Sequence, residues 1–319
     1  MKYRTLGKTN LTISEIGFGT AQIGGMSHIG GRHVGYPIIE TSKALKILNN
    51  AYDIGINFYD TSDKYGDGKA ERLLAKVFSG KRDRVVYATK CGITATGNRC
   101  FEKKYVKSRL EQSLRNLKTT YIDVYLLTKP DMTLIESEEI YELLNDLKSE
   151  GKIRYSGIST GTDEEALKLV SGNQVDTLQV FYNLLHINPN QLFIKNAFDS
   201  GIGLMVRSPL SSGLLTGKYN YDTTFAKGDN RSYFLHGQIL KSRVDIVAKI
   251  KKHFQLNSEY SILHFSLNYL LSNSKLSTIV VGINETSQFY DILKVFRIQR
   301  MKADEFLEVE KFMVNIADE

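Results

Sequence analysis

Short apolar runs alternate with amphipathic segments from one end of the chain to the other. This alternation limits the possible folds more than any other feature of the sequence. Each run has the length and composition of a parallel strand that is buried on both faces. Eight such strands are predicted, at residues 15–19, 58–60, 85–90, 122–127, 153–158, 177–181, 203–207 and 278–281.

The segments between these strands carry apolar residues at helical spacing. A further helix is predicted to begin at Asp163, because the three acidic residues 163–165 suit the positive end of a helix dipole. The clearest apolar stripes are Ala44, Ile47, Leu48 and Ala51, then Val106, Leu110, Leu114 and Leu117, and finally Ile140, Leu143, Leu144 and Leu147.

Eight strand–helix units without a Pro- or Ser-rich linker predict an α/β fold, namely one closed (β/α)8 TIM barrel. We expect residues 1–319 to form this single domain. A β-hairpin from residues 3–5 and 11–13 is expected to close the barrel bottom, and residues 303–315 are expected to form a last helix. Two domains or a doubly wound sheet are alternatives. However, residues 17–22 lack the third glycine of a dinucleotide fingerprint.

The charge and the few cysteines indicate which surroundings and partners to expect. The net charge is +7, but Lys and Arg are spread along the chain, so we expect no nucleic-acid partner. A positive balance also suits a cofactor or substrate that carries phosphates. No apolar run reaches the roughly 18 residues of a membrane span. With two cysteines and no apolar signal core, a cytoplasmic protein is expected.

Polar residues at the ends of predicted strands are the first candidates for a site, because barrel enzymes place their chemistry there. Asp60 ends the second strand, Tyr65 lies five residues further, and Lys90 ends the third strand. A buried lysine needs a partner, and Asp60 is available. The ammonium of such a pair stabilises a phenolate, which predicts a lowered pKa for Tyr65. The alternative is a structural ion pair beside a tyrosine that only packs.

Several motifs together resemble the aldo-keto reductases. They are "GINFYDTSDKYGDGKAERLLAK", "VVYATKCG", "VFYNLLH", "SPLSSGLLTGKY" and "VVGINETSQ". The resemblance implies a (β/α)8 barrel that binds a nicotinamide cofactor in extended form and acts on a small-molecule carbonyl substrate. In that family, the catalytic tetrad consists of Asp, Tyr, Lys and His. Asp60, Tyr65 and Lys90 match, whereas Thr128 stands where the histidine is usual.

Thr128 leaves two functions open. A threonine hydroxyl donates one hydrogen bond, but it carries no charge near neutral pH and is a poor acid. The first hypothesis is an oxidoreductase that reduces an aldehyde or a ketone, for example a keto-sugar, with Tyr65 as proton donor. The alternative is a non-catalytic sensor or subunit that binds the nicotinamide cofactor.

The resemblance also implies a set of cofactor contacts. Ser159 and Gln179 match positions that hold the nicotinamide carboxamide, although the alternative for Gln179 is a satisfied core amide. Arg207 stands where many members stack an aromatic ring on the nicotinamide. Residues 283–287 hold no Arg or Lys for a 2′-phosphate, so NADP is expected through resemblance alone and NAD stays open. The remaining matches are Ser208, Leu210, Ser212 and Lys218 for the diphosphate, and Gly282 and Gln288 for the adenosine side.

Loops at the barrel mouth are expected to set the substrate. They are residues 24–37, 91–105 and 222–234. Three histidines, at positions 28, 33 and 186, lack the spacing and companion carboxylates of a metal site, so no metal is expected. Cations near the mouth suggest a phosphorylated or nucleotide-linked sugar. They are Arg32, Arg99, Lys103 and Lys129.

Overall fold

Eight parallel strands close into a barrel in the order β10-β11-β12-β3-β6-β7-β8-β9. The structure is a computed structural model that describes residues 1–187 and 192–317. The (β/α)8 prediction is confirmed, and every predicted strand boundary lies within one residue of the observed one. The barrel strands are β3 (Ile16–Gly19), β6 (Phe58–Asp60), β7 (Val86–Cys91), β8 (Ile122–Thr128), β9 (Ile153–Ser159), β10 (Thr177–Phe181), β11 (Gly203–Arg207) and β12 (Thr278–Gly282).

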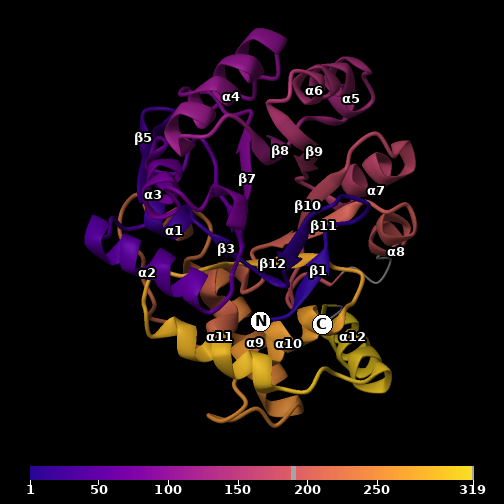
Figure 1. Ribbon diagram of the computed structural model, residues 1–319. Coiled ribbons are helices and arrows are strands. Elements are labelled where there is room, and N and C mark those ends of the chain that lie inside the picture. Colours follow the sequence, from indigo (N-terminus) through magenta and orange to yellow (C-terminus); the bar gives the residue numbers. More distant parts are fainter. Residues whose placement is uncertain (188–191, 318–319) are drawn as a thin grey trace.

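Helices surround the strands (Figure 1). The predicted apolar stripes are the buried faces of α2, α4 and α6. A capping box begins α7, in which Thr162 accepts the Glu165 N–H. The longer helices are α2 (Thr41–Asp53), α3 (Lys69–Val77), α4 (Lys103–Leu117), α6 (Glu139–Ser149), α7 (Asp163–Gly172), α8 (Leu192–Asp199), α9 (Gly237–His253), α10 (Ile262–Ser272), α11 (Gln288–Arg297) and α12 (Ala303–Ala317). Shorter elements are α1 (Ala21–Gly24), α5 (Met132–Ile135), η1 (Arg82–Arg84), η2 (Ser211–Thr216) and η3 (Asn230–Tyr233).

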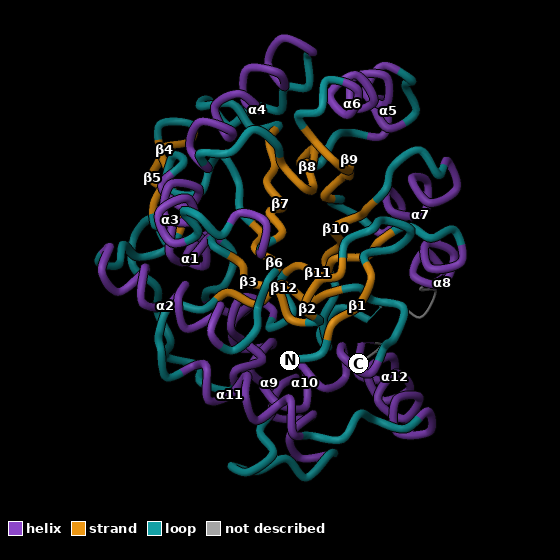
Figure 2. Tube along the Cα trace, viewed as in Figure 1, coloured by secondary structure: helices purple, strands orange, loops and turns teal. Residues whose placement is uncertain are grey.

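The apolar core has two layers. A large outer layer lies between the strands and the helices. A smaller cluster fills the barrel itself, where the hairpin of β1 (Tyr3–Thr5) and β2 (Thr12–Ser14) contributes Leu6, Leu11 and Ile13. Figure 2 shows this hairpin across the central strands. The hairpin prediction is therefore confirmed, and the opposite, carboxyl end of the strands is left for the site.

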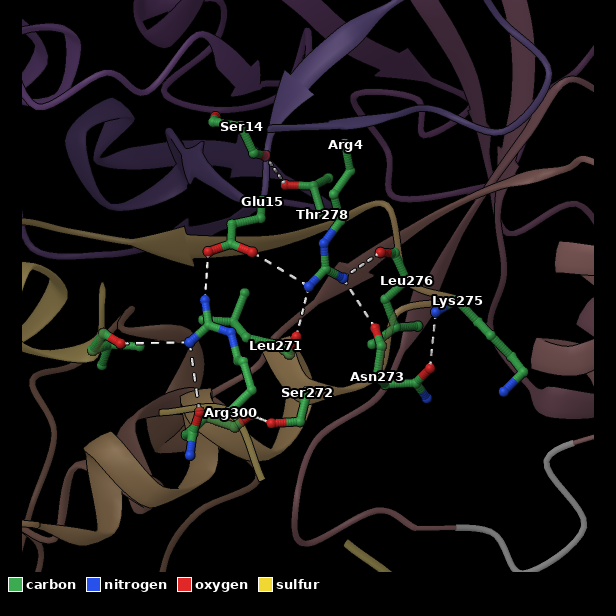
Figure 3. Close-up of polar contacts among 12 residues, drawn as sticks. Arg4, Ser14, Glu15, Leu271, Ser272, Asn273, Lys275, Leu276, Thr278 and Arg300 are labelled. Atoms are coloured by element: carbon green, nitrogen blue, oxygen red, sulfur yellow. Dashed lines mark hydrogen bonds and ion pairs between the residues drawn. The ribbon is translucent and has the colours of Figure 1, made fainter. Parts of the chain in front are cut away.

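A buried carboxylate ties the closed end of the barrel together (Figure 3). Glu15 is 2% exposed and lies between two guanidinium groups. Arg4 Nη2 donates to one carboxylate oxygen at 3.3 Å, and Arg300 Nη2 donates to the other at 2.5 Å. Arg4 also donates to the Leu271 and Leu276 carbonyls. The two ion pairs of Glu15 thus connect the first hairpin and the segment before α12 to the start of β3.

A second hairpin follows β3, where the sequence predicted only a loop. It consists of β4 (Met26–Ile29) and β5 (Arg32–Gly35), with His28 opposite His33. Its two-residue turn has positive φ at Gly30 and Gly31, which glycine adopts without strain. The Ser27 hydroxyl donates to the Lys64 carbonyl and accepts the Gly66 N–H. The hairpin therefore braces the loop that carries Tyr65.

The segment at residues 222–234 packs against this hairpin. Buried Asp229 forms an ion pair with Arg231 at 2.6 Å, and the Gly35 N–H donates to the Gly228 carbonyl. Arg231 also donates to the Tyr219 hydroxyl at 2.9 Å, which in turn donates to the Ser212 carbonyl. The two mouth segments thus support the loop after β11. Within the described residues, no helix is long and apolar enough to cross a membrane.

Candidate active site at the carboxyl ends of the strands

The alternation of side chains along each strand brings the polar residues to one place. Val86 and Ala88 of β7 lie in the core inside the barrel, so Lys90 on the same face of the strand also points inward. The same count places Thr128 two residues beyond Leu126 of β8. Three more strands end in the same way, with the last inward residue two positions after an apolar residue of the barrel core. These pairs are Phe58 and Asp60, Met205 and Arg207, and Val280 and Gly282. The apolar cluster inside the barrel is therefore followed by a layer of polar side chains at the carboxyl ends of the strands.

Lys90 and Asp60 form the ion pair that the sequence predicts. Lys90 Nζ donates to both Asp60 carboxylate oxygens, at 2.7 and 2.8 Å, and to the Thr61 carbonyl at 2.8 Å. Both side chains are buried. Burial disfavours the charge on Lys90, but Asp60 and Tyr65 together outweigh it and hold the pKa of Lys90 above its usual value. The ammonium is therefore a fixed cation in this layer.

Tyr65 lies beside this cation, on the loop between β6 and α3. Its ring centroid is 5.1 Å from Lys90 Nζ. Burial raises the pKa of Tyr65 above its usual value, while the charges of Lys90 and Arg207 act in the opposite direction. The predicted net lowering of this pKa is therefore wrong, because loss of solvent outweighs the nearby cations. The phenol stays protonated at neutral pH.

Thr128 occupies the inward position at the end of β8. It pairs in register with Ser159 of β9 and is half-buried. Among the described residues, none forms a hydrogen bond with its hydroxyl. The backbone nitrogen of Thr128 lies 3.3 Å from where a Cβ on Gly92 would stand, so the loop after β7 runs close to this strand end. The hydroxyl is available to a ligand.

Ser159 and Gln179 are joined to the ion pair by hydrogen bonds. The Ser159 hydroxyl donates to Gln179 Oε1 at 3.0 Å, and Gln179 Nε2 donates to Asp60 Oδ1 at 2.8 Å. Both residues are almost completely buried. Gln179 is thus a satisfied core amide, and it also links two predicted cofactor contacts to the catalytic pair.

Arg207 ends β11 with its guanidinium 5.1 Å from the centre of the Phe181 ring. Its Nη2 donates to the Thr160 carbonyl at 2.9 Å. Its buried Nε–H has no hydrogen-bond partner within the part of the chain that the structure describes. Burial lowers the pKa of Arg207, yet an arginine keeps its charge near neutral pH. A buried donor without an acceptor is costly, so this position favours a ligand.

The loop after β11 holds an unusual backbone. Ser208, Ser211 and Ser212 all have φ values near +50°, from 47° to 56°. Non-glycine residues in this region each cost roughly 1 kcal/mol or more and tend to occur at ligand-binding sites. Leu210 is half-buried against the core, and Lys218 is exposed. Such successive N–H groups in alternating conformations form concave anion sites, as the diphosphate prediction requires.

Gly282 and Gln288 lie at the end of β12 and the start of α11. A Cβ on Gly282 would stand 2.1 Å from Gln22 Nε2, so the amide end of the Gln22 side chain lies directly against Gly282. Gln288 Oε1 accepts the N–H groups of Asn284 and Glu285, at 2.9 and 3.1 Å. It therefore shapes the loop after β12. The structure joins Asp60, Lys90, Gln179 and Ser159 in one hydrogen-bonded network and places Tyr65 and Thr128 beside it. Residues 208–218, Gly282 and Gln288 lie along the β11–β12 side.

Several contacts that support the site were not predicted from the sequence. Arg109 of α4 donates to Asp63 at 2.7 Å, and the Asp63 N–H donates to the Lys90 carbonyl at 3.3 Å. The Thr20 hydroxyl and N–H both donate to the Asp60 carbonyl. These contacts fix the ends of β6 and β7. The one available signal was the spacing of Asp63, which lies three residues after Asp60 in the polar loop that follows β6.

The described residues contain no group of three or more His, Cys, Asp and Glu side chains that is suited to a metal ion. Cys91 follows Lys90, and burial raises the pKa of its thiol to about 12. It is therefore an inert core residue. Among the mouth cations, Lys103 forms an exposed ion pair with Asp146 of α6 at 2.6 Å.

Comparison with known proteins agrees with this geometry. The model of the Aldo/keto reductase family matches residues 15–313. The aldo-keto reductase YhdN of Bacillus subtilis is 28% identical over 295 residues, which cover 90% of this chain and 86% of that protein. The NADH-specific methylglyoxal reductase of Escherichia coli is 28% identical over 327 residues, with 95% and 96% covered.

A solved structure with the same fold is the aldo-keto reductase AKR11C1 from Bacillus halodurans in its holo form. It superimposes with a TM-score of 0.78 at 24% identity, and the match covers 98% of this chain and 96% of that one. At this identity the likeness concerns the fold.

Proposed function

Since this chain belongs to the aldo/keto reductase family of oxidoreductases, we propose that it reduces an aldehyde or ketone with a nicotinamide cofactor and with Tyr65 as proton donor. The observation that carries the proposal is the buried Lys90 ammonium, held by Asp60 at 2.7 Å and lying 5.1 Å from the Tyr65 ring centroid. A core that needed only packing would gain nothing from a buried charge at this place. One domain of residues 1–319 performs the reaction in the cytoplasm.

The residues of the β11–β12 side fit such a cofactor. The strained serine loop offers backbone N–H groups to a diphosphate, and the Arg207 Nε–H has no acceptor among the described residues. Ser159 and Gln179 would hold the carboxamide, Ser208, Leu210, Ser212 and Lys218 the diphosphate, and Gly282 and Gln288 the adenosine side. When bound, the reduced cofactor supplies the hydride. NADP is the first choice, and NAD is the alternative because residues 283–287 contain no cation.

The chain's own residues supply the proton and the orientation. Tyr65 is protonated at neutral pH and donates its phenolic proton to the carbonyl oxygen as that oxygen gains negative charge. Lys90 stabilises the phenolate that remains. Asp60, held by Gln179 and Thr20, keeps Lys90 in place. The Thr128 hydroxyl donates a second hydrogen bond to the carbonyl oxygen, in place of the usual histidine.

Threonine instead of histidine favours a bulkier substrate. The shorter side chain leaves space at the end of β8, and its hydroxyl also suits the oxygen-rich surface of a sugar. A keto-sugar or a related hydroxyketone is therefore the substrate class that we propose.

The test is a single-turnover experiment. Protein loaded with NADPH or NADH is mixed with aldehydes, ketones and keto-sugars, and the cofactor absorbance is followed. Oxidation of the cofactor by the wild type, and its loss in Tyr65→Phe, would support the proposal. Tight cofactor binding without turnover on any compound would instead support the second candidate, a non-catalytic cofactor-binding sensor or subunit, which Thr128 alone favours.

A further inference from the structure

Three cations extend the polar layer on the β7–β11 side of the barrel mouth. Arg99 lies on the loop after β7, Lys129 follows β8, and Arg207 ends β11. Lys129 directly follows Thr128, and Arg207 lies near enough to Tyr65 and Asp60 for these groups to act on its charge. Arg99 pairs with Ile93 in a short bridge, and the Lys129 N–H donates to the Ser159 carbonyl at 2.8 Å. Arg99 thus lies on the loop after the strand that carries Lys90, Lys129 follows Thr128, and Arg207 itself ends its strand.

These cations have no carboxylate of their own. Within residues 1–187 and 192–317, no Asp or Glu lies within ion-pair distance of Arg99, Lys129 or Arg207. The carboxylate of Glu165 acts on Lys129, but its Oε2 accepts the N–H groups of Gly161 and Thr162. Arg99 is exposed, whereas Lys129 and Arg207 are partly buried. Other partly buried cations, such as Arg109 with Asp63 and Arg231 with Asp229, do have acidic partners. Asp60 and Glu165 also act on Arg207, so the positive charge of the three cations is offset only in part, without a direct ion pair in the described chain.

Two further observations indicate that this charge meets a ligand. The Arg207 Nε–H is buried and has no acceptor in the described chain. Lys129 is half-buried, and its stem runs past Gly161, where a Cβ would lie 3.6 Å from its Cδ. Burial and the charges of Arg207 and Arg99 lower the pKa of Lys129, so the cations act on one another. Their mutual repulsion is relieved when an anion binds between them.

We propose that Arg99, Lys129 and Arg207 form an anion subsite beside Thr128, which selects a carbonyl substrate that carries a phosphate ester or a carboxylate. This inference rests on the proposed reductase function and names the substrate class of that same site. A phosphate ester matches three cations better than a carboxylate does, because it carries up to two negative charges. The subsite lies mainly after β7 and β8, whereas the proposed diphosphate contacts follow β11 and β12. Arg99 and Lys129 therefore come from other strand ends than the diphosphate contacts, while Arg207, which directly precedes Ser208, borders both sites.

The test compares matched pairs of substrates. The pairs are glyceraldehyde 3-phosphate with glyceraldehyde, dihydroxyacetone phosphate with dihydroxyacetone, and succinic semialdehyde with butanal. We expect the wild type to favour the anionic member of a pair in kcat/KM. Lys129→Gln and Arg99→Gln should each reduce this preference by about tenfold, as for a lost charge-assisted hydrogen bond. The preference should also fall with ionic strength.

Lys103→Gln is the matched control. It removes the same charge from the start of α4, where Lys103 already pairs with Asp146, and it should leave both substrates unaffected. If a neutral carbonyl is reduced and the anionic one is not preferred, or if the preference survives in Lys129→Gln/Arg99→Gln, the anion subsite is wrong while the reductase function stands.

If no compound is turned over, a binding measurement tests the anion subsite directly. Inorganic phosphate is titrated calorimetrically into wild type, Lys129→Gln/Arg99→Gln and Lys218→Gln. The subsite predicts that binding weakens at least tenfold in the double variant and persists in Lys218→Gln. Binding that is equal in all three proteins, or absent from the wild type, would overturn the inference. Loss of turnover with the expected binding pattern would overturn only the reductase function.

Discussion

Gln179 Nε2 donates to Asp60 Oδ1 at 2.8 Å, across the inside of the barrel from β10 to β6. Because Gln179 Oε1 accepts from the Ser159 hydroxyl, one amide connects the proposed carboxamide contacts to the ion pair of Lys90 and Asp60. Cofactor binding and orientation of the catalytic cation thus depend on the same side chain.

Replacing Gln179 by Met should therefore weaken both cofactor binding and the orientation of the Lys90 ammonium. The variant keeps the side-chain length but leaves one Asp60 oxygen with fewer donors, which costs about 1–3 kcal/mol of stability. We expect weaker cofactor binding and a lower kcat, measured by fluorescence titration and single turnover. Thr177→Val, two residues earlier on β10, removes a different buried hydrogen bond and should leave the cofactor Kd unchanged. Equal effects of the two changes would contradict the link.

The role of Tyr65 as proton donor predicts that Tyr65→Phe loses about 10²–10⁴-fold in the rate of cofactor oxidation. Cofactor affinity should change little, because only the hydroxyl is removed. Tyr36→Phe is the control, since burial raises the pKa of Tyr36 to about 12 and Tyr65 lies near enough to add to that shift. A Tyr65→Phe variant that reduces substrate at the wild-type rate would exclude the proposed mechanism.

The pKa of Tyr65 also fixes the pH dependence. Burial raises this pKa above the usual value of about 10, so the acid form persists through neutral pH. The rate of reduction should then be level from pH 6 to about 9 and fall only in the alkaline range, where the phenol ionises. Oxidation of an alcohol needs the phenolate and should rise with pH instead. A falling limb near pH 7 in single-turnover reduction would show that another group donates the proton.

Thr128 tests whether the missing histidine limits the chemistry. We expect Thr128→His to reduce simple aldehydes about 10–100-fold faster, because an imidazole is a better donor to the carbonyl oxygen. The larger ring should at the same time raise KM for bulky ketones. Thr128→Val keeps the shape without the hydroxyl and should be slower than the wild type. Identical kinetics of Thr128→Val and wild type would mean that the hydroxyl makes no contact with the substrate.

The closed end of the barrel offers a test of stability that is separate from catalysis. Glu15→Gln leaves Arg4 and Arg300 facing each other without a carboxylate, which should cost about 3 kcal/mol, at the lower end for a broken buried pair. Urea unfolding measures this loss. Asp146→Asn removes an exposed partner of Lys103 and should cost at most about 1 kcal/mol. Similar losses in both variants would show that Glu15 has no special role.

The sequence by itself determined the barrel and the positions of its polar layer. Strand ends at Asp60, Lys90 and Thr128 are visible because a strand buried on both faces must be apolar until it reaches the mouth. The hairpin of β4 and β5 was missed, since its short strands lie outside the barrel and carry no apolar pattern.

Only the tertiary structure decided how these polar groups act on one another. The pKa of Tyr65 depends on the amount of solvent removed around it, and the sequence does not show that amount. The bond from Gln179 to Asp60, the bond from Arg109 to Asp63 and the action of Arg207 on Lys129 all join residues from different strands and helices. Periodicity places each residue on its own element, whereas the closure of the barrel sets the distances between elements, and electrostatic interactions depend on those distances.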